Sequence, residues 1–210
     1  MKASRITVAT FGTILGIAGL EHGIGEILQG NRVPESIFIQ SWPDEKLYEI
    51  LAGEPAMTIV PNLLLTGILA VLVSAILIIW AIAFIERKHG GLILIVLSFI
   101  MMLVGGGLAG PILMGIIVGL AGTRINSKFA WMEEHVNARN VLAKIWKPVY
   151  IVSVVSWFSL WPGLIILSIF VSVVEPLIVI VLTLLSFISM LLAIISSFAS
   201  DSFNNQDLNV

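Results

Sequence analysis

Four long stretches of the sequence are almost free of charged side chains. A helix that crosses a bilayer needs about 20 consecutive apolar residues, and each stretch reaches or exceeds that length. The stretches cover residues 6–28, 55–85, 90–123 and 148–200. Only 11% of all residues are charged and the mean hydropathy is +1.06, whereas soluble domains carry about 25% charged residues. The sequence therefore predicts an all-α integral membrane protein that crosses the bilayer several times.

The distribution of Lys and Arg predicts the orientation of the chain, because these residues gather in cytoplasmic loops. If the stretches 90–123 and 148–200 each cross twice, all of them except Arg32 and Lys46 fall on one side. We therefore expect a bundle of about six helices in the plasma membrane, with both termini cytoplasmic. The helices are expected at about residues 6–28, 61–85, 90–106, 109–123, 149–174 and 176–199. Together they would form one domain over residues 1–200, followed by a polar tail over residues 201–210.

Two connecting segments are expected to form helices at the membrane surface. In the outer segment, residues 29–54, Ser41 followed by Trp42-Pro43 is typical of a helix start, and the helix would end at Gly53. The inner segment, residues 127–147, alternates apolar and charged residues and predicts an amphipathic helix. A different reading of the N-terminus stays open, because a basic start followed by an apolar run also fits a cleaved secretory signal.

Composition and motifs exclude several classes of function. The chain has no cysteine, which excludes disulfides, thiolate chemistry and cysteine-ligated metals. Its net charge of −2 and its lack of a basic patch exclude a nucleic-acid binder. Neither a His-Glu-x-x-His nor a Gly-x-Ser-x-Gly motif occurs, so we expect no catalytic residue, cofactor or metal. The bilayer is the expected partner, and a homo-oligomer or a heterologous membrane partner stays open.

The first helix carries small residues on one face. Gly12, Gly16, Gly19 and Gly23 recur at steps of three or four, which places them on one stripe. Small residues on a stripe let a second backbone approach closely. The pattern predicts that this helix packs at the centre of the bundle.

Glu21, His22 and Glu26 form the main candidate site, because ionisable groups at membrane depth are costly and usually face a partner or a pathway. If the helix enters the hydrocarbon near Ile6, about 20 residues cross it, and the three lie near the outer boundary. At the boundary they would form a solvated rim cluster, or His22 and Glu26 would pair. Slightly deeper they would form a proton- or cation-binding site reached from outside. A metal site is not expected, because Glu21 points about 140° away from Glu26 and zinc needs three or four converging ligands.

A glycine-rich segment with one proline divides the stretch of residues 90–123. It leaves about 15 residues, or about 23 Å of helix, on each arm, which is less than the hydrocarbon thickness of about 30 Å. The hairpin is therefore either a short element that lines a pathway or a tight turn between closely packed helices. The candidate hairpin residues are Gly105, Gly106, Gly107, Gly110 and Pro111.

Two further polar residues are candidates for a role in the site. Asn62 follows Pro61 at the start of the second expected helix, where an N-cap is the simpler interpretation. Glu175 precedes Pro176, and we expect it to lie in an outer turn between the last two helices.

Three short stretches resemble a small family of uncharacterised prokaryotic polytopic membrane proteins. They are Glu-His-Gly-Ile-Gly-Glu at residues 21–26, Ala-Gly-Glu-Pro-Ala-Met at residues 52–57 and Glu-Arg-Lys-His-Gly-Gly at residues 86–91. The resemblance covers residues 1–125 and implies no activity, cofactor or site residue.

Two functions remain after these exclusions. The leading hypothesis is a non-enzymatic transporter or channel for a small solute or ion, with an outer-facing Glu/His site. The alternative is an accessory, immunity-type or assembly subunit that acts through protein contacts in the membrane.

Overall fold

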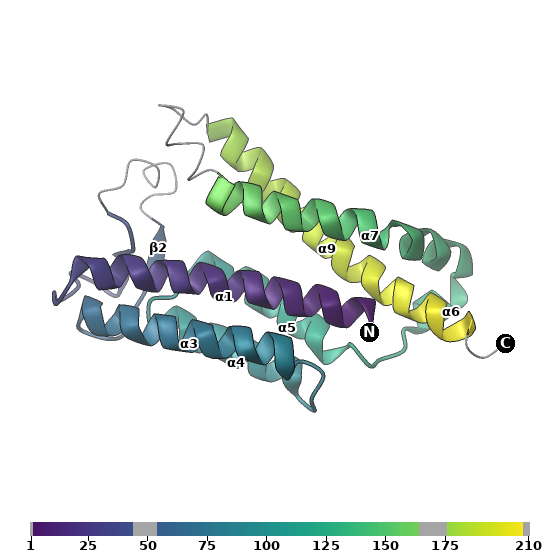
Figure 1. The fold of residues 1–210 in the computed structure, drawn as a ribbon, viewed down its shortest axis with the longest axis horizontal. Coiled ribbons are helices and arrows are strands. Elements are labelled where there is room, and N and C mark those ends of the chain that lie inside the picture. The colour runs from purple at the N-terminus through teal and green to yellow at the C-terminus, as the bar shows by residue number, and fades with distance from the viewer. Residues whose placement is uncertain (1, 44–53, 164–175, 208–210) are drawn as a thin grey trace. The chain divides into compact units, whose positions relative to one another are not determined.

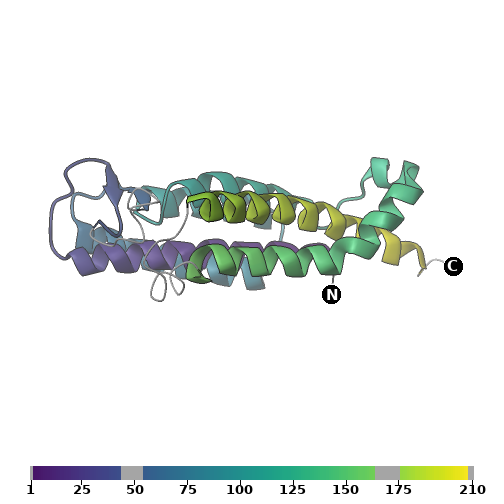
Figure 2. The ribbon, with the colours of Figure 1, turned by 90° about the horizontal axis from the view of Figure 1, so that it is seen from above.

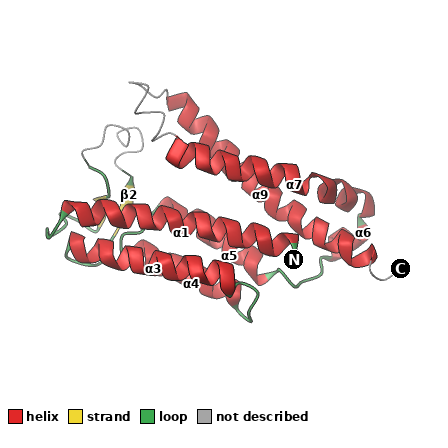
Figure 3. Cartoon of the chain, in the orientation of Figure 1, coloured by secondary structure: helices red, strands yellow, loops and turns green. Residues whose placement is uncertain are grey.

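The computed structural model describes residues 2–43, 54–163 and 176–207 (Figure 1). Helices make up most of this part of the chain (Figure 3), which confirms the all-α class. Four of the described helices are long and apolar enough to cross a bilayer, as expected of a multi-pass membrane protein. They are α1 (Ala3–Gln29), α3 (Leu63–Ala83), α7 (Val136–Phe158) and α9 (Pro176–Asp207).

The chain divides into two compact units where the sequence predicted one domain over residues 1–200. One unit is Val8–Arg124, and the other combines Met1–Thr7 with Ile125–Val210. The division reflects helix packing. Helix α7 packs mainly against α9, whereas α4 (Gly90–Leu103) packs mainly against α5 (Gly115–Thr123). The candidate residues of α1 and of the glycine-rich hairpin all belong to Val8–Arg124.

The glycine stripe of α1 faces α3, and the two helices lie side by side (Figure 1). A Cβ atom added to Gly12 would lie 2.7 Å from the Cβ of Ala81, and one added to Gly23 would lie 2.8 Å from the carbonyl oxygen of Gly67. Two backbones can approach this closely only because glycine has no side chain at these positions. The predicted packing of α1 against another helix is therefore confirmed.

The other side of α3 is apolar and exposed. Buried positions on this helix are mostly small, and include Ala70 and Ser74. Large aliphatic side chains recur at steps of three or four on the exposed side: Leu65, Ile68, Leu72, Ile76, Ile79 and Ile82. An exposed apolar stripe along a whole helix is unusual for a soluble monomer, and it fits a surface in contact with lipid.

The stretch of residues 90–123 forms a helical hairpin. Its arms are α4 (Gly90–Leu103), with 14 residues, and the π-helical turn η1 (Gly110–Met114) continued by α5 (Gly115–Thr123). An arm of this length measures about 21 Å, so the expected six crossings appear as four long helices and one shorter hairpin. The hydroxyl of Ser98 lies 3.1 Å from the carbonyl oxygen of Pro111 and links the two arms, which also pack closely where Gly91 meets Gly119.

The segment of the chain that connects α1 to α3 contains a two-stranded antiparallel ribbon. Strand β1 (Phe38–Gln40) pairs with β2 (Pro55–Met57), with Ile39 opposite Ala56. The pairing brings Ser41 and Glu54 together, since the Ser41 amide donates to the Glu54 carbonyl oxygen at 3.3 Å. The surface helix expected after Ser41 falls mainly on residues outside those the structure describes.

The second unit is built on α7 and α9, which run side by side (Figure 2). Helix α7 continues through Pro148. It therefore combines part of the expected surface helix, residues 127–147, with the start of the crossing expected at residues 149–174. The short α6 (Ala130–Glu134) precedes it and the π-helical turn η2 (Ser159–Gly163) follows it. Helix α9 continues to Asp207, within the polar tail expected over residues 201–210. In this part of the helix, the Asp201 carboxylate accepts hydrogen bonds from the amides of Ala3 and Ser4 at the start of α1.

Candidate functional site

Three segments of the Val8–Arg124 unit meet at the C-terminal end of α1. The helix itself supplies Glu21, His22 and Glu26 within two turns. The ribbon supplies Ser41, directly after β1, and Glu54, directly before β2. The side chain of Gln29 anchors the ribbon to α1, because its amide donates to the carbonyl oxygens of Gln40 and Ser41, both at 3.0 Å.

His22, Ser41 and Glu26 form a hydrogen-bonded chain. His22 Nδ1 lies 2.8 Å from Ser41 Oγ, and Ser41 Oγ donates to Glu26 Oε1 at 3.3 Å. A serine hydroxyl has one hydrogen, so while Ser41 donates to Glu26 it accepts from the Nδ1–H of His22. A neutral His22 then carries its free lone pair on Nε2. The expected direct pair of His22 and Glu26 is thus replaced by a bridge through Ser41.

The free ring nitrogen of His22 faces two carboxyl groups. His22 Nε2 lies 3.8 Å from Glu54 Oε2, and ligand atoms of Glu21, His22 and Glu54 all lie within 4.8 Å of one another. Glu21 and Glu54 also share a side-chain hydrogen bond. Burial, followed by the nearby charge of Glu21, raises the pKa of Glu54 above its usual value. These three residues are called the Glu–His–Glu cluster below.

The turn that ends α4 covers this cluster with glycines. Gly105 and Gly107 have φ angles of +97° and +89°, which residues other than glycine rarely adopt. A Cβ atom at Gly107 would lie 2.8 Å from His22 Nε2, and one at Gly105 would collide with the carboxylate of Glu26. The structure therefore joins two features that the sequence analysis treated separately, the ionisable end of α1 and the glycine-rich hairpin.

The carboxyl groups on α1 are buried. Glu26 is 0% exposed and Glu21 is 9% exposed. Gly67 near the start of α3 packs against Gly23, and Gly105 packs against Glu26, so the cluster lies level with the ends of the neighbouring helices. The ribbon lies over it at this level. A solvated rim is therefore not the arrangement found in the structure.

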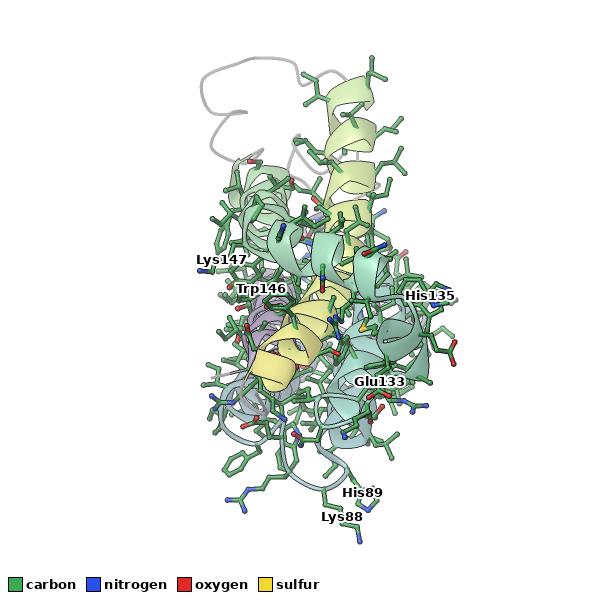
Figure 4. All side chains as sticks on the ribbon, turned by 90° about the vertical axis from the view of Figure 1, so that its right-hand side faces the viewer. Lys88, His89, Glu133, His135, Trp146 and Lys147 are labelled. Atoms are coloured by element: carbon green, nitrogen blue, oxygen red, sulfur yellow. The ribbon has the colours of Figure 1, made fainter. Side chains whose placement is uncertain are left out.

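The remaining candidates lie outside this cluster. Asn62 is the N-cap of α3, since its side-chain oxygen accepts from the Leu65 amide at 3.0 Å. Gly106 packs against Met101, and a Cβ atom added to Gly110 would be in ordinary contact distance of Leu15. Pro111 belongs to the π-helical turn η1, and Glu175 lies outside the residues that the structure describes. His89, in the loop after α3, is exposed and projects outward at the lower edge of Figure 4.

Sequence reasoning missed Ser41 and Glu54 as parts of the site. It assigned Ser41 to a helix start and treated Glu54 only as the last residue of the outer segment. Their meeting depends on the pairing of β1 with β2, and each strand has only three residues. The usable signal was the short apolar run that each residue flanks, at residues 37–39 and 56–60.

One imidazole and three carboxyl groups in a buried place can bind a proton or a small cation. No protein-family model, curated protein or solved structure matches this chain. Any functional assignment therefore depends on the chemistry of this site.

Proposed function

We propose that this chain is a non-enzymatic multi-pass membrane protein that transports a small cation through a site formed by Glu21, His22, Glu26 and Glu54. The observation that carries the proposal is the convergence of three carboxyl groups and an imidazole in a buried place at the end of α1. Burial of ionisable groups at membrane depth is costly, and proteins keep it where it serves a pathway or a partner.

The short hairpin supports a pathway. The turn between α4 and η1 places non-helical backbone beside Glu26 and His22, and such backbone is tolerated in a membrane protein where it lines a protein-walled or water-filled cavity. Broken or short helices mark the binding sites of many transporters. We further propose, from the distribution of Lys and Arg, that the site opens to the outer side and that both termini are cytoplasmic in the plasma membrane.

A flux assay on the reconstituted full-length chain tests the proposal. Uptake of protons, monovalent cations and divalent cations is measured in proteoliposomes for the parent chain and for the variants Glu26→Gln and His22→Ala. We expect one cation to be transported by the parent chain and transport to fall at least tenfold in both variants. Glu35→Gln and His89→Asn change exposed residues of the same types and should leave the flux unchanged.

Two results would contradict this function. The first is the absence of flux for every cation tested, and the second is a flux that both variants retain in full. If flux is absent and a heterologous membrane protein co-purifies in stoichiometric amount, the accessory-subunit alternative is the better description.

A further inference from the structure

We infer that the cation is a divalent transition metal of the zinc type, bound by the Glu–His–Glu cluster of Glu21, His22 and Glu54. The inference rests on the proposed cation-binding function of this site and specifies its ligand. It reverses the expectation from the sequence, which considered only Glu21, His22 and Glu26 and did not include Glu54.

The donor atoms favour this class of metal. Imidazole nitrogen suits zinc, copper, iron and nickel, whereas calcium and magnesium prefer sites made only of oxygen. Two carboxylates match the charge of one divalent ion. Three protein ligands with a fourth position left to water occur in catalytic zinc sites, in contrast to closed structural sites with four protein ligands. We expect a site with fewer protein ligands to exchange its ion more readily. An exchangeable site is what a transported ion requires.

The geometry needs only a small closure. At metal–ligand distances of about 2.1 Å, the ligand atoms of a tetrahedral site lie about 3.4 Å apart. His22 Nε2 and Glu54 Oε2 are 3.8 Å apart, and the ligand atoms of all three residues lie within 4.8 Å. The side chains must therefore approach by about one ångström or slightly more, which rotation of the two glutamate side chains provides.

The hydrogen bonds around His22 orient its imidazole ring for metal binding. Metal-bound histidines usually donate their other ring N–H to a polar neighbour, which fixes the ring and its tautomer. Ser41 accepts from His22 in this way, and it is itself held by Glu26. The lone pair of Nε2 is thereby directed away from Ser41 and toward the carboxyl groups.

Two observations outside the cluster also point to a ligand. Glu26 is fully buried, yet its Oε2 has no hydrogen-bond partner, which leaves acceptor capacity for a cation or its bound water. Gly107 has no side chain where a Cβ atom would press on His22 Nε2 at 2.8 Å. The glycine thus leaves room beside the ring nitrogen that would bind the metal.

Spectroscopic titration of the purified full-length chain with Co²⁺ tests the inference, with Zn²⁺ and Ca²⁺ as competitors. We expect one Co²⁺ per chain, displaced by Zn²⁺ but not by a hundredfold excess of Ca²⁺. Loss of the orienting hydrogen bond in Ser41→Ala should weaken Zn²⁺ binding about 10- to 100-fold. Glu54→Gln and His22→Ala should weaken it further, and the matched controls Glu35→Gln and His89→Asn should bind as the parent does.

X-ray absorption at the zinc edge keeps the test independent of folding defects in any one variant. The parent should show the scattering of one imidazole, and His22→Glu, which keeps a ligand at this position, should lose that signature while still binding zinc. No Co²⁺ binding, or binding that His22→Ala and Glu54→Gln leave intact, overturns the metal assignment. Flux of protons or monovalent cations would then still support the transport function. Conversely, zinc binding at this site without flux of any cation would overturn transport and leave the metal site standing.

Discussion

Gly107 lies against the imidazole of His22, at a backbone φ angle of +89°. The contact joins the tip of the α4–η1 hairpin to the ionisable end of α1, two segments far apart in the sequence. It has two consequences at once, because the positive φ requires glycine and the missing Cβ leaves room beside His22 Nε2. The hairpin and the site therefore depend on each other.

Replacing Gly107 with alanine should destabilise the chain and weaken the site. A left-handed backbone costs a residue with a Cβ atom about 1–2 kcal/mol, and the added carbon would press on His22. We expect a lower midpoint of thermal unfolding in detergent and weaker Co²⁺ binding. Gly110→Ala is the control, because a Cβ there would meet only Leu15 at 3.5 Å. Equal behaviour of the two variants would contradict the proposed role of the turn.

The buried carboxyl group of Glu54 should make the metal-free chain less stable as pH rises. Because burial raises the pKa of Glu54 in the folded chain, folded Glu54 keeps a proton that the unfolded chain releases above its ordinary pKa. The free energy of unfolding should then decrease with pH by at most about 1.4 kcal/mol per unit for one such proton. The decrease runs from the unfolded pKa up to the raised folded value.

Chemical unfolding between pH 5 and 8, in the presence of a chelator, measures this slope. Glu54→Gln should make the slope less negative than that of the parent, since the amide does not titrate. Glu35→Gln changes an exposed residue and should keep the slope of the parent. Equal slopes for the parent chain and Glu54→Gln would show that Glu54 is not held in its neutral form.

Bound zinc should stabilise the folded chain. A ligand that binds only the folded state adds about 2.7 kcal/mol at a free concentration one hundred times its dissociation constant. We expect the midpoint of thermal unfolding to rise with Zn²⁺ and to return to its starting value when a chelator is added. The rise should be much smaller in Glu54→Gln at the same zinc concentration. An equal rise in both chains would place the zinc elsewhere.

The helices could be predicted from the sequence because their signals are local. Apolar runs of sufficient length and the spacing of Gly12 and Gly23 are properties of the chain itself, and both led to the correct result for α1. Glu21, His22 and Glu26 could be singled out for the same reason, since charge within an apolar run is visible without a structure. The number of long helices was less certain, because the arms around Gly105 are shorter than a bilayer core.

The composition of the site could not be predicted in this way. Ser41 and Glu54 reach His22 only through the pairing of two three-residue strands, and strands this short have no distinctive periodicity. Gly107 reaches His22 through the fold of the hairpin over α1. These contacts join residues far apart in the sequence, and neither spacing nor composition determines such a contact.

Substitution on the glycine stripe should separate α1 from α3. A side chain at Gly23 would meet the carbonyl oxygen of Gly67 at 2.8 Å, and a backbone atom cannot turn aside as a flexible side chain can. Gly23→Val should therefore cost at least about 1–3 kcal/mol of stability through overpacking. Ile82→Ala, on the exposed apolar side of α3, should cost less than 1 kcal/mol by comparison, because little packing is lost there. Thermal unfolding of both variants in the same detergent decides the comparison.

The absence of cysteine from the sequence allows the orientation of the site to be tested directly. A single cysteine introduced in Glu35→Cys or Lys88→Cys is the chain's only thiol, and both positions are exposed. Lys88 projects outward at the lower edge of Figure 4. If the α1–α3 segment faces outward, as the distribution of Lys and Arg predicts, a membrane-impermeant maleimide added to intact cells should label position 35. It should label position 88 only after the membrane is opened.

The reverse pattern would place the cluster of Glu21, His22 and Glu54 on the cytoplasmic side and reverse the direction from which its ion enters. Labelling of both positions in intact cells would mean that the chain has no fixed orientation, and the proposed outer-facing site would then be wrong.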